Sequence, residues 1–528
     1  MRASALRRTA VADSSKRGAR TASYVLAAIV ALAAALRLFD LSSVPSELNY
    51  DEIDLYNSAY SIVHTGHDVD GRLMPFLYSP YSRNPPLYGI ASYASAQILG
   101  RTAFALRLPA VLFGLAAIVL LYAIVLELTR RREIALIAAM LAAIQPIFVH
   151  FSRVGWEPAA ELPFVLGGLY LLLRWRGDLE TALWAALVLG IASYTYMAAW
   201  FYSALLGGVL LVLRAASLRG KSAWLAVPAA AAAWLVVSWP ALLMLFTDPL
   251  TRGRAQRIFT FAAGVTPQTL TAFAHNYAVH FSAQYLVLTG MPQSGTTWRY
   301  LNGFGAFFWW VLPLAALGVA FSQTLVRDRP LRWWLLLWLA AYPLGGALTN
   351  EGVPNAPRTL AGAPIFCIYA ALGAWGVYRD IRRWQPRSSW LKGVRYGIPM
   401  APAVLALYSV LNFAIFYFTR YVHTNSNAWD SGTAAMFARV RLLSPGAQRV
   451  CFSVRPAWYE IAAYERFYLA GDPIERFDDV NDPACSAPGT LIVTDTDHPL
   501  QRPGFHRAAR IFDVDGNPFT DIDVRPSG

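Results

Sequence analysis

Long apolar runs fill the first four fifths of the chain and are separated by polar turns. A run of about 20 apolar residues is the length that a helix needs to cross a bilayer. The pattern predicts eleven spans, at residues 22–39, 105–126, 134–150, 159–173, 181–197, 200–213, 223–246, 304–322, 333–349, 359–377 and 397–419. The weakest division lies between the fifth and sixth spans, where only Ala198 and Ala199 would form the turn.

Basic residues are distributed unevenly around these runs. With the N-terminus placed in the cytoplasm, the inner segments hold more than twice as many lysines and arginines as the outer segments before residue 420. Cytoplasmic loops of membrane proteins carry such an excess. We therefore expect a cytoplasmic basic segment at 1–21 and a transmembrane domain at 22–419. Because eleven is odd, residues 420–528 fall on the outer side.

Two outer segments, 40–104 and 247–303, are too long to be simple connectors. The first contains Asp51–Val63 and Tyr88–Leu99, whose spacing favours amphipathic helices that lie at the membrane interface.

The C-terminal part, 420–528, has no run of spanning length. Short strand-like runs occur there at Arg449–Val454, Leu491–Thr494 and Ile511–Val514, separated by Pro, Gly and Asp. The expected fold class is therefore mostly α: a polytopic membrane protein of about eleven spans with interfacial helices and a small outer α/β domain.

Composition agrees with this class. Hydrophobic residues make up 56% of the chain and charged residues 15%, against about 45–50% and about 25% in soluble globular proteins. Collagen, coiled coil, disordered chain and small disulfide scaffold are excluded. The net charge of +13 is explained by the excess of basic residues in the predicted cytoplasmic segments. We therefore expect a lipid bilayer and no nucleic acid as partner. The Ala- and Arg-rich composition favours a bacterial cytoplasmic membrane.

The chain has three cysteines. Cys367 lies within a predicted span, where core packing explains it. Cys451 and Cys485 lie in the outer domain, where an oxidising compartment permits a bridge, but spacing alone leaves the pairing open. No metal is assigned to a site, because the histidines lack the spacing of a rigid ligand set; a requirement for a divalent metal stays open.

The sequence Asn49-Tyr50-Asp51-Glu52-Ile53-Asp54 holds the strongest cluster of carboxylates. Three such groups close to a membrane surface favour a functional interpretation. Helix capping is the alternative, since Asp51 or Asn49 could cap the following helix and Glu52 could favour its first turn.

Three arginines lie at predicted outer boundaries: Arg83, Arg153 and Arg358. A guanidinium donates two hydrogen bonds at once, which suits phosphate. Each has a structural alternative. Arg83 could extend to lipid head groups, Arg153 could pair with Glu157 across a turn, and Arg358 could anchor the topology.

These residues, in this order, resemble the GT-C membrane glycosyltransferases, which use polyprenyl-phosphate sugars and include the protein O-mannosyltransferases and the lipid A aminoarabinose transferase. The resemblance covers roughly residues 20–420. It rests on Tyr50-Asp51-Glu52, on Asn84-Pro85-Pro86-Leu87-Tyr88, on the run from Gly100 and Phe104 through Arg107-Leu108-Pro109, and on the turn Thr349–Pro364.

The resemblance implies that Asp51 is the catalytic base, with Glu52 beside it, and that cations around the same cavity hold the donor phosphate. Arg83, Arg153 and Arg358 are the candidates for that role; Asn84, Tyr88 and Glu157 are further site candidates. The chain departs from many relatives at two positions. Asn84 stands where they have Lys, and Asn355 stands near the position of a His.

The function so implied is an inverting transfer of a sugar from a polyprenyl-phosphate donor to an acceptor hydroxyl at the outer face of the membrane. The acceptor is a glycan, a lipid or a protein. The alternative is a transporter or lipid flippase without glycosyl transfer. A sensor or scaffold would explain the outer domain, but not the carboxylates of the first outer segment. Few charges occur within the spans away from their ends, whereas transporters place ionisable residues at the bilayer midplane.

Overall fold

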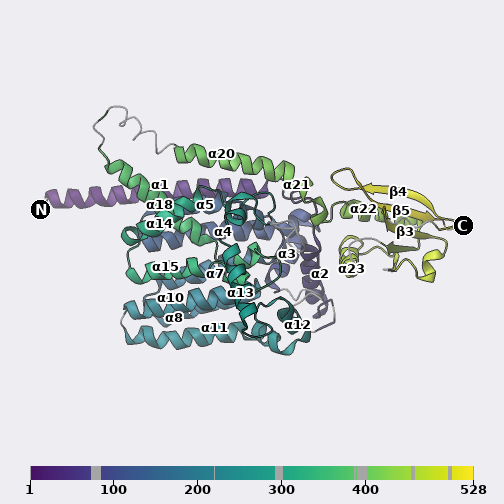
Figure 1. Cartoon of the computed structure of the whole chain (residues 1–528), viewed down its shortest axis with the longest axis horizontal. Coiled ribbons are helices and arrows are strands. Elements are labelled where there is room, and N and C mark those ends of the chain that lie inside the picture. The colour runs from purple at the N-terminus through teal and green to yellow at the C-terminus, as the bar shows by residue number, and fades with distance from the viewer. Residues whose placement is uncertain are drawn as a thin grey trace.

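The computed structural model describes residues 2–69, 71–72, 85–218, 220–291, 301–385, 388, 401–453, 458–477, 479–497 and 502–526. Most of the described chain is a bundle of roughly parallel and antiparallel helices (Figure 1). Each of the eleven predicted spans overlaps a main helix of the bundle, and some also overlap a short helix next to it. The main helices are α1 (Arg2–Leu38), α4 (Ala103–Thr129), α5 (Arg132–Ile144), α7 (Pro158–Arg174), α8 (Leu179–Ile191), α9 (Met197–Tyr202) continuing into α10 (Gly208–Leu218), α11 (Lys221–Thr247), α14 (Val311–Leu325), α15 (Arg329–Ala341), α18 (Pro364–Arg383) and α20 (Ala401–Ile415).

Five helices in the described part are long and apolar enough to cross a membrane: Gly18–Leu38, Ala103–Thr129, Met197–Leu218, Lys221–Met244 and Ala401–Thr424. Leu179–Tyr194 and Val311–Leu325 are apolar but shorter. The mostly helical membrane architecture is therefore confirmed, while the number of eleven spans stays a prediction.

Two helix boundaries differ from the predicted ones. The span expected at 134–150 is divided, because Pro146 lacks an amide hydrogen and forces Gln145 into an extended conformation (φ −67°, ψ 136°). A short helix, α6 (Pro146–Phe151), follows this break. The turn expected at Ala198 and Ala199 is wrong by a few residues, since the extended residue is Tyr196 (φ −152°, ψ 148°).

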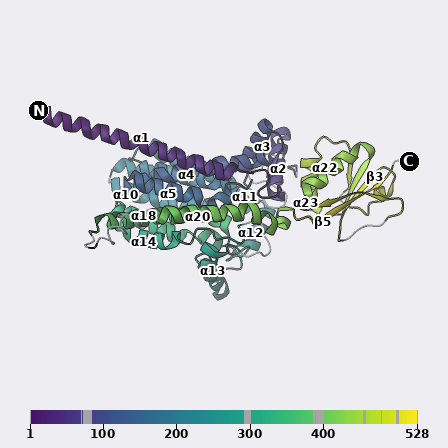
Figure 2. The same cartoon turned by 90° about the horizontal axis from the view of Figure 1, so that it is seen from above.

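An outer layer of shorter helices covers one end of the bundle (Figures 1 and 2). It includes the two interfacial helices expected in the first outer segment, which are confirmed as helices. Its members are α2 (Tyr50–Thr65), α3 (Leu87–Leu99), α12 (Pro249–Ile258), α13 (Pro267–Val279), α16 (Leu344–Ala347) and α17 (Ala356–Thr359). The beginning of α1 and the C-terminal domain lie at opposite ends of the molecule (Figure 1); the orientation in the membrane stays a prediction.

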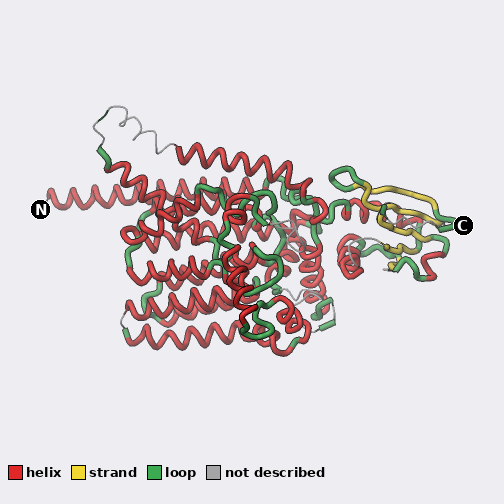
Figure 3. The backbone as a smooth tube through the Cα atoms, in the orientation of Figure 1, coloured by secondary structure: helices red, strands yellow, loops and turns green. Residues whose placement is uncertain are grey.

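The C-terminal domain contains the only named strands of the described chain (Figure 3). Its sheet has the order β2-β1-β3-β5-β4, with parallel pairing among β1, β2 and β3 and antiparallel pairing of β5 with β3 and β4. The small C-terminal α/β domain is confirmed, and its sheet contains two further strands, β2 and β5, that the sequence pattern did not predict. The elements are α21 (Tyr421–Thr424), α22 (Thr433–Leu443), β1 (Arg449–Ser453), α23 (Trp458–Tyr468), β2 (Glu475–Phe477), β3 (Thr490–Asp495), β4 (His506–Phe512) and β5 (Pro518–Arg525).

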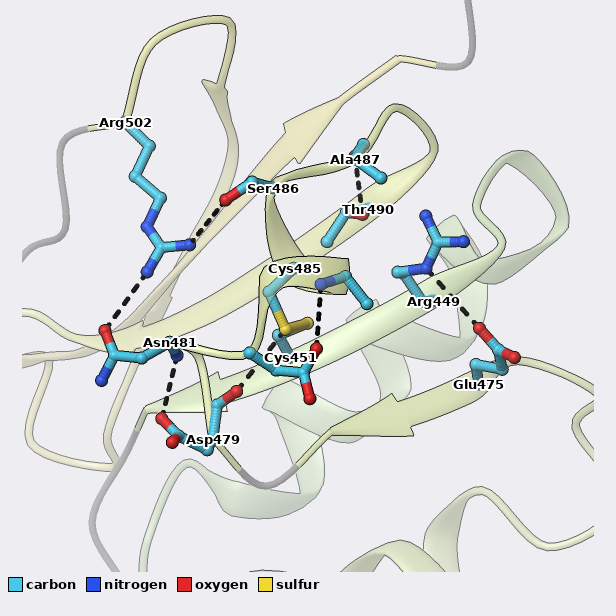
Figure 4. Close-up of a disulfide and its surroundings, with 12 residues drawn as sticks. Arg449, Cys451, Glu475, Asp479, Asn481, Cys485, Ser486, Ala487, Thr490 and Arg502 are labelled. Atoms are coloured by element: carbon cyan, nitrogen blue, oxygen red, sulfur yellow. Dashed lines mark hydrogen bonds and ion pairs between the residues drawn. A yellow bond between two sulfur atoms is a disulfide. The ribbon is translucent and has the colours of Figure 1, made fainter.

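Alternating residues of β1 serve the two faces of the sheet. Val450 and Phe452 belong to a core that also includes residues of α22, α23 and α2. Cys451 faces the other side and forms a disulfide with Cys485, with 6.0 Å between the two Cα atoms (Figure 4). The pairing that spacing left open is therefore formed.

The C-terminal domain is attached to the outer layer by direct bonds. The Glu47 carboxylate accepts the backbone N–H groups of Gly432 and Ala434 at 2.9 and 2.7 Å, at the N-terminal end of α22. Asn57 of α2 donates to the carbonyl of Ala463 in α23 at 2.7 Å. Helix α2 also shares an apolar core with this domain. Hydrogen bonds and apolar contacts therefore both hold the C-terminal domain against α2.

Candidate active site

Helix α2 begins at a capping box. The Asn49 side chain accepts the backbone N–H groups of Asp51 and Glu52 at 2.8 and 3.3 Å, and the Glu52 carboxylate accepts the backbone N–H of Asn49 at 3.0 Å. These bonds satisfy amide groups that the first turn of a helix leaves without partners. The capping interpretation is thus confirmed for Asn49 and Glu52, while Asp51 is the capped residue.

Glu52 is fully engaged in the protein interior. Its Oε1 lies 2.9 Å from Arg107 Nε and accepts the backbone N–H of Gly155 at 2.7 Å. Its Oε2 accepts from Arg107 Nη2 at 3.1 Å and from Asn49. A Cβ at Gly155 would lie 2.8 Å from Glu52 Oε1, so glycine permits this approach. The geometry favours Glu52 as the residue that orients α2.

Arg153 is also held by the fold. Its Nη1 donates to the carbonyls of Leu36 and Arg37 at 3.0 and 2.8 Å, and its Nη2 donates to those of Asp40 and Val44 at 3.2 and 2.9 Å. These carbonyls belong to the end of α1 and the turn after it. The buried Arg153 side chain therefore caps the C-terminal end of α1. Neither the predicted pairing with Glu157 nor a phosphate contact is needed to explain it.

A second group of charges lies on another side of α2. Asp51 is half-buried and Asp54 is buried, and both act electrostatically on Glu157, which precedes α7. Burial, and then the charge of Asp51, raise the pKa of Glu157 to about 8. Arg254 of α12 acts in the opposite sense. The fold therefore brings predicted residues Asp51 and Glu157 together, 106 positions apart in sequence.

Arg254 is not engaged in the way that Arg153 is. Its Nη1 is buried and has no hydrogen-bond partner within the described residues. A buried donor without a partner is costly, and a carboxylate or phosphate oxygen would satisfy it. The site thus combines carboxyl groups that can accept a proton with a guanidinium that can hold an anion.

Arg358 lies in a turn that is joined to α12. Asn350 N–H donates to the carbonyl of Ile258 at 2.8 Å, at the end of α12. Arg358 Nη1 donates to Thr349 Oγ1 at 2.6 Å, and Nη2 lies 2.8 Å from Glu351 Oε2. These bonds hold the Arg358 guanidinium in a defined direction. The hydrogen bond between Asn350 and Ile258 fixes the turn to α12, the helix of Arg254.

His280 holds the turn that contains Arg358 in place. Its Nε2 accepts the backbone N–H of Asn355 at 2.9 Å, so Nδ1 carries the proton and donates to the carbonyl of Asn276 at 2.6 Å. Burial, and then the neighbouring charge of Arg358, lower the pKa of His280 to about 4. A neutral ring with both nitrogens engaged acts as a structural support.

The remaining predicted residues have different outcomes. Arg83 and Asn84 lie outside the described residues. Tyr88 is buried in α3, and its hydroxyl donates to the carbonyl of Leu106 at 2.9 Å. This bond fixes α3 to the first turn of α4, and the Tyr88 ring packs in a small core with Leu55 of α2 and Ala159 of α7.

Sequence reasoning did not single out Arg254, Arg107 or His280 as site residues. A signal for Arg254 was present: residues 247–303, predicted to lie outside, contain Asp248-Pro249 followed by Arg252, Arg254 and Arg257. Asp followed by Pro is a favourable start for a helix. Three arginines in a predicted outer segment are also unusual, because most basic residues of this chain lie in the predicted inner segments. In the described part of the chain no three His, Cys, Asp or Glu side chains gather in a way that could hold a metal ion.

A family model described as dolichyl-phosphate-mannose-protein mannosyltransferase matches residues 83–242. A search of curated proteins found no match. The family match includes α3 to α10 and most of α11, which contain the turn of Arg153 and Glu157 but not Asp51.

Solved structures share the fold over almost the whole chain. ArnT from Cupriavidus metallidurans in the apo state matches with 14% identity and a TM-score of 0.54, covering 95% of this chain and 98% of ArnT. The same protein bound to undecaprenyl phosphate covers 94% and 97%, with the same TM-score and identity. The oligosaccharyltransferase AglB from Archaeoglobus fulgidus, in complex with an inhibitory peptide and a dolichol-phosphate, gives 14% identity and a TM-score of 0.51 over 90% of this chain and 69% of AglB.

The resemblance to the GT-C superfamily is confirmed by these findings: the chain has the GT-C fold, and a family model of glycosyltransferases matches part of it. The family model covers residues 83–242, less than half of the chain, and the solved structures share the fold at 14% identity.

Proposed function

We propose that this protein is an inverting glycosyltransferase that moves a sugar from a polyprenyl-phosphate donor to an acceptor hydroxyl at the outer face of the cytoplasmic membrane. The observation that carries the proposal is the group formed by Asp51, Glu157 and Arg254 at the outer end of a GT-C bundle. Relatives of the same fold have been solved with undecaprenyl phosphate and with a dolichol-phosphate, which supports a lipid-linked donor.

Asp51 is the proposed general base. Its carboxylate takes the proton of the acceptor hydroxyl while that oxygen attacks the anomeric carbon. The bond between the anomeric carbon and the phosphate oxygen breaks, and the electron pair leaves with the polyprenyl phosphate. Attack from the face opposite the leaving group inverts the anomeric centre. Because the leaving phosphate is already a weak base, no general acid is required.

The cations hold the charge that grows on the leaving phosphate. We assign this role to Arg254, whose buried Nη1 has no hydrogen-bond partner among the described residues. We assign it also to Arg358, whose turn is bonded to the end of α12 and whose guanidinium would exchange the Glu351 carboxylate for the phosphate. Arg83 stays a prediction. Arg153 is left out, because four carbonyls occupy its two terminal nitrogens.

Glu157 keeps the total charge of the site low. With a pKa of about 8, its carboxyl is mostly neutral at pH 7. A neutral Glu157 leaves the negative charge on Asp51, where the base is needed, and does not repel the donor phosphate.

The test is a transfer assay with the full-length protein in lipid nanodiscs. A panel of radiolabelled polyprenyl-phosphate sugars is offered to the wild type, to Asp51→Asn and to the matched control Asp380→Asn, whose side chain is 52% exposed at the end of α18. We expect transfer, or slow hydrolysis of the donor, by the wild type and the control only. Full activity of Asp51→Asn would remove Asp51 from the mechanism. A folded protein that is inactive with every donor but moves lipid across vesicles would be the flippase of the alternative interpretation.

A further inference from the structure

We propose that a cleft between the outer layer and the C-terminal domain binds an acidic saccharide, a sugar that carries a carboxylate or phosphate group. The cleft has a volume of about 480 Å³, within the range of small-ligand sites. Its lining residues come from α2, from the segment before α4, from α22 and from α23 with the turn after it; Figure 1 shows α2 beside α23. Its lining includes Tyr60, Arg101, Arg441, Phe467 and Tyr468.

Two guanidinium groups supply the positive charge of the cleft. Arg101 precedes α4, and Arg441 lies in the last turn of α22. Both residues are exposed, and in the described part of the chain neither forms an ion pair with a carboxylate. Two unpaired arginines at one cleft favour an anionic ligand, because the planar guanidinium matches carboxylate and phosphate oxygens.

Aromatic rings supply most of the remaining lining, which also includes Ala470 and Gly471. The Arg101 guanidinium lies 5.1 Å from the centroid of the Tyr60 ring and 5.9 Å from that of Tyr56. Phe467 meets Tyr56 edge to face at 5.4 Å, and Phe467 also contacts Tyr468 at 5.0 Å. Rings packed in this way form a rigid apolar surface, to which the tyrosine hydroxyl groups add polar atoms. The C–H faces of a pyranose can pack on such rings while its hydroxyl groups bond to tyrosine, which distinguishes a saccharide from a simple anion.

The cleft is separate from the proposed active site. Tyr60 follows Asp51 by nine residues of α2, which places it about 13.5 Å farther along the helix and half a turn away. A ligand in the cleft therefore cannot be the reacting sugar. The cleft would retain a remote acidic unit of a glycan. This inference goes beyond the proposed function and does not need it, since the site is tested by binding.

The test measures binding of hexagalacturonate to the full-length protein in nanodiscs of neutral lipid. We expect saturable binding by the wild type. The Arg441→Gln and Arg101→Gln variants should each bind about tenfold more weakly, the loss expected for one charge-assisted hydrogen bond. The matched control is Arg466→Gln, an exposed arginine of α23 outside the lining of the cleft, which should bind like the wild type. Because Arg101 also contacts α2, Arg441→Gln is the decisive variant, and thermal unfolding checks that each variant is folded.

Three results would overturn the inference. Equal binding of neutral maltohexaose would show that charge plays no part. Inorganic phosphate that competes as well as an equal concentration of hexagalacturonate would reduce the cleft to a small-anion site. An equal loss in Arg466→Gln and Arg441→Gln would indicate attraction by overall charge. Failure of the transfer assay leaves these readouts unchanged, so the two proposals fail separately.

Discussion

The two faces of α2 meet different surroundings. The face that carries Asp51 and Asp54 meets Glu157 and Arg254 at the outer end of the bundle. The face with Tyr60 meets the C-terminal domain and the aromatic cleft. Residues nine positions apart point to opposite sides of a helix. One rigid helix can therefore separate the proposed chemistry from the surface that holds the outer domain.

The same separation occurs within the first turn of α2. Asp51 and Glu52 are adjacent carboxylates, but successive residues of a helix point about 100° apart. Glu52 enters the interior and meets Arg107 and Gly155, whereas Asp51 stays half-buried beside Glu157. The difference indicates that residue type alone does not distinguish the proposed catalytic carboxylate from its neighbour; the burial and partners of each group do.

The largest expected effects come from exchanging these two carboxylates for amides. Asp51→Asn should reduce transfer by about 10²–10⁴-fold, the contribution of a general base, with little change in thermal unfolding. Glu52→Gln should reduce stability by about 3–5 kcal/mol, because it leaves Arg107 charged and buried without its counter-ion. Thermal unfolding in detergent and the transfer assay measure the two effects. If Glu52→Gln unfolds like the wild type yet is inactive, Glu52 takes part in catalysis, and the division between a structural Glu52 and a reactive Asp51 is wrong.

The next effect concerns the phosphate contact. Arg254→Gln should lower kcat by about 10²-fold, similar to removal of one donor from an oxyanion site. Arg252→Gln is the matched control, since Arg252 is exposed on the other side of α12. Steady-state kinetics with a lipid-linked donor separates the two variants. An equal decrease in both would mean that α12 contributes only a general positive field.

The pH dependence of transfer sharpens the role of Glu157. Its pKa is raised to about 8 by burial and by Asp51, so the neutral form is present below about pH 8. Above that pH ionised Glu157 should repel the donor phosphate, and activity should fall by up to about tenfold per pH unit. In Glu157→Gln, which cannot ionise, this alkaline decrease should disappear. A decrease that persists in the variant would assign it to another group.

The raised pKa of Glu157 should also make the free energy of unfolding depend on pH. The folded state retains the Glu157 proton to higher pH than the unfolded state, whose carboxyl ionises near its ordinary pKa of 4.5. The contribution of this group to stability is therefore greatest below pH 4.5 and is lost as pH rises to about 8. Comparison of unfolding temperatures of the wild type and Glu157→Gln over this interval isolates the contribution from those of other groups.

The smallest expected effect lies on the other face of α2. Asn57→Ala removes the hydrogen bond to the carbonyl of Ala463 and should weaken docking of the C-terminal domain by about 1 kcal/mol. Hydrogen exchange in α23 should become faster, while transfer stays close to that of the wild type. A strong loss of transfer in this variant would show that the two faces of α2 are coupled.

Several features followed from the sequence because they depend on local pattern. Apolar runs marked the helices of the bundle, and amphipathic spacing marked α2 and α3. The break at Pro146 follows from the chemistry of proline, although the expected span ran through it. The strands β2 and β5 were missed, since one has only three residues and the other holds charged residues.

By itself the sequence determined the class of protein, a helical membrane protein with a C-terminal α/β domain, and pointed to Asp51 and Glu157 as site candidates. Only the tertiary structure decided what each charged side chain meets. The pairing of Glu52 with Arg107, the closure of α1 by Arg153 and the approach of Arg254 to Glu157 join residues 55 to 117 positions apart. Helical periodicity fixes the direction of a side chain along its own helix, but the groups that it reaches across the bundle depend on how whole helices pack.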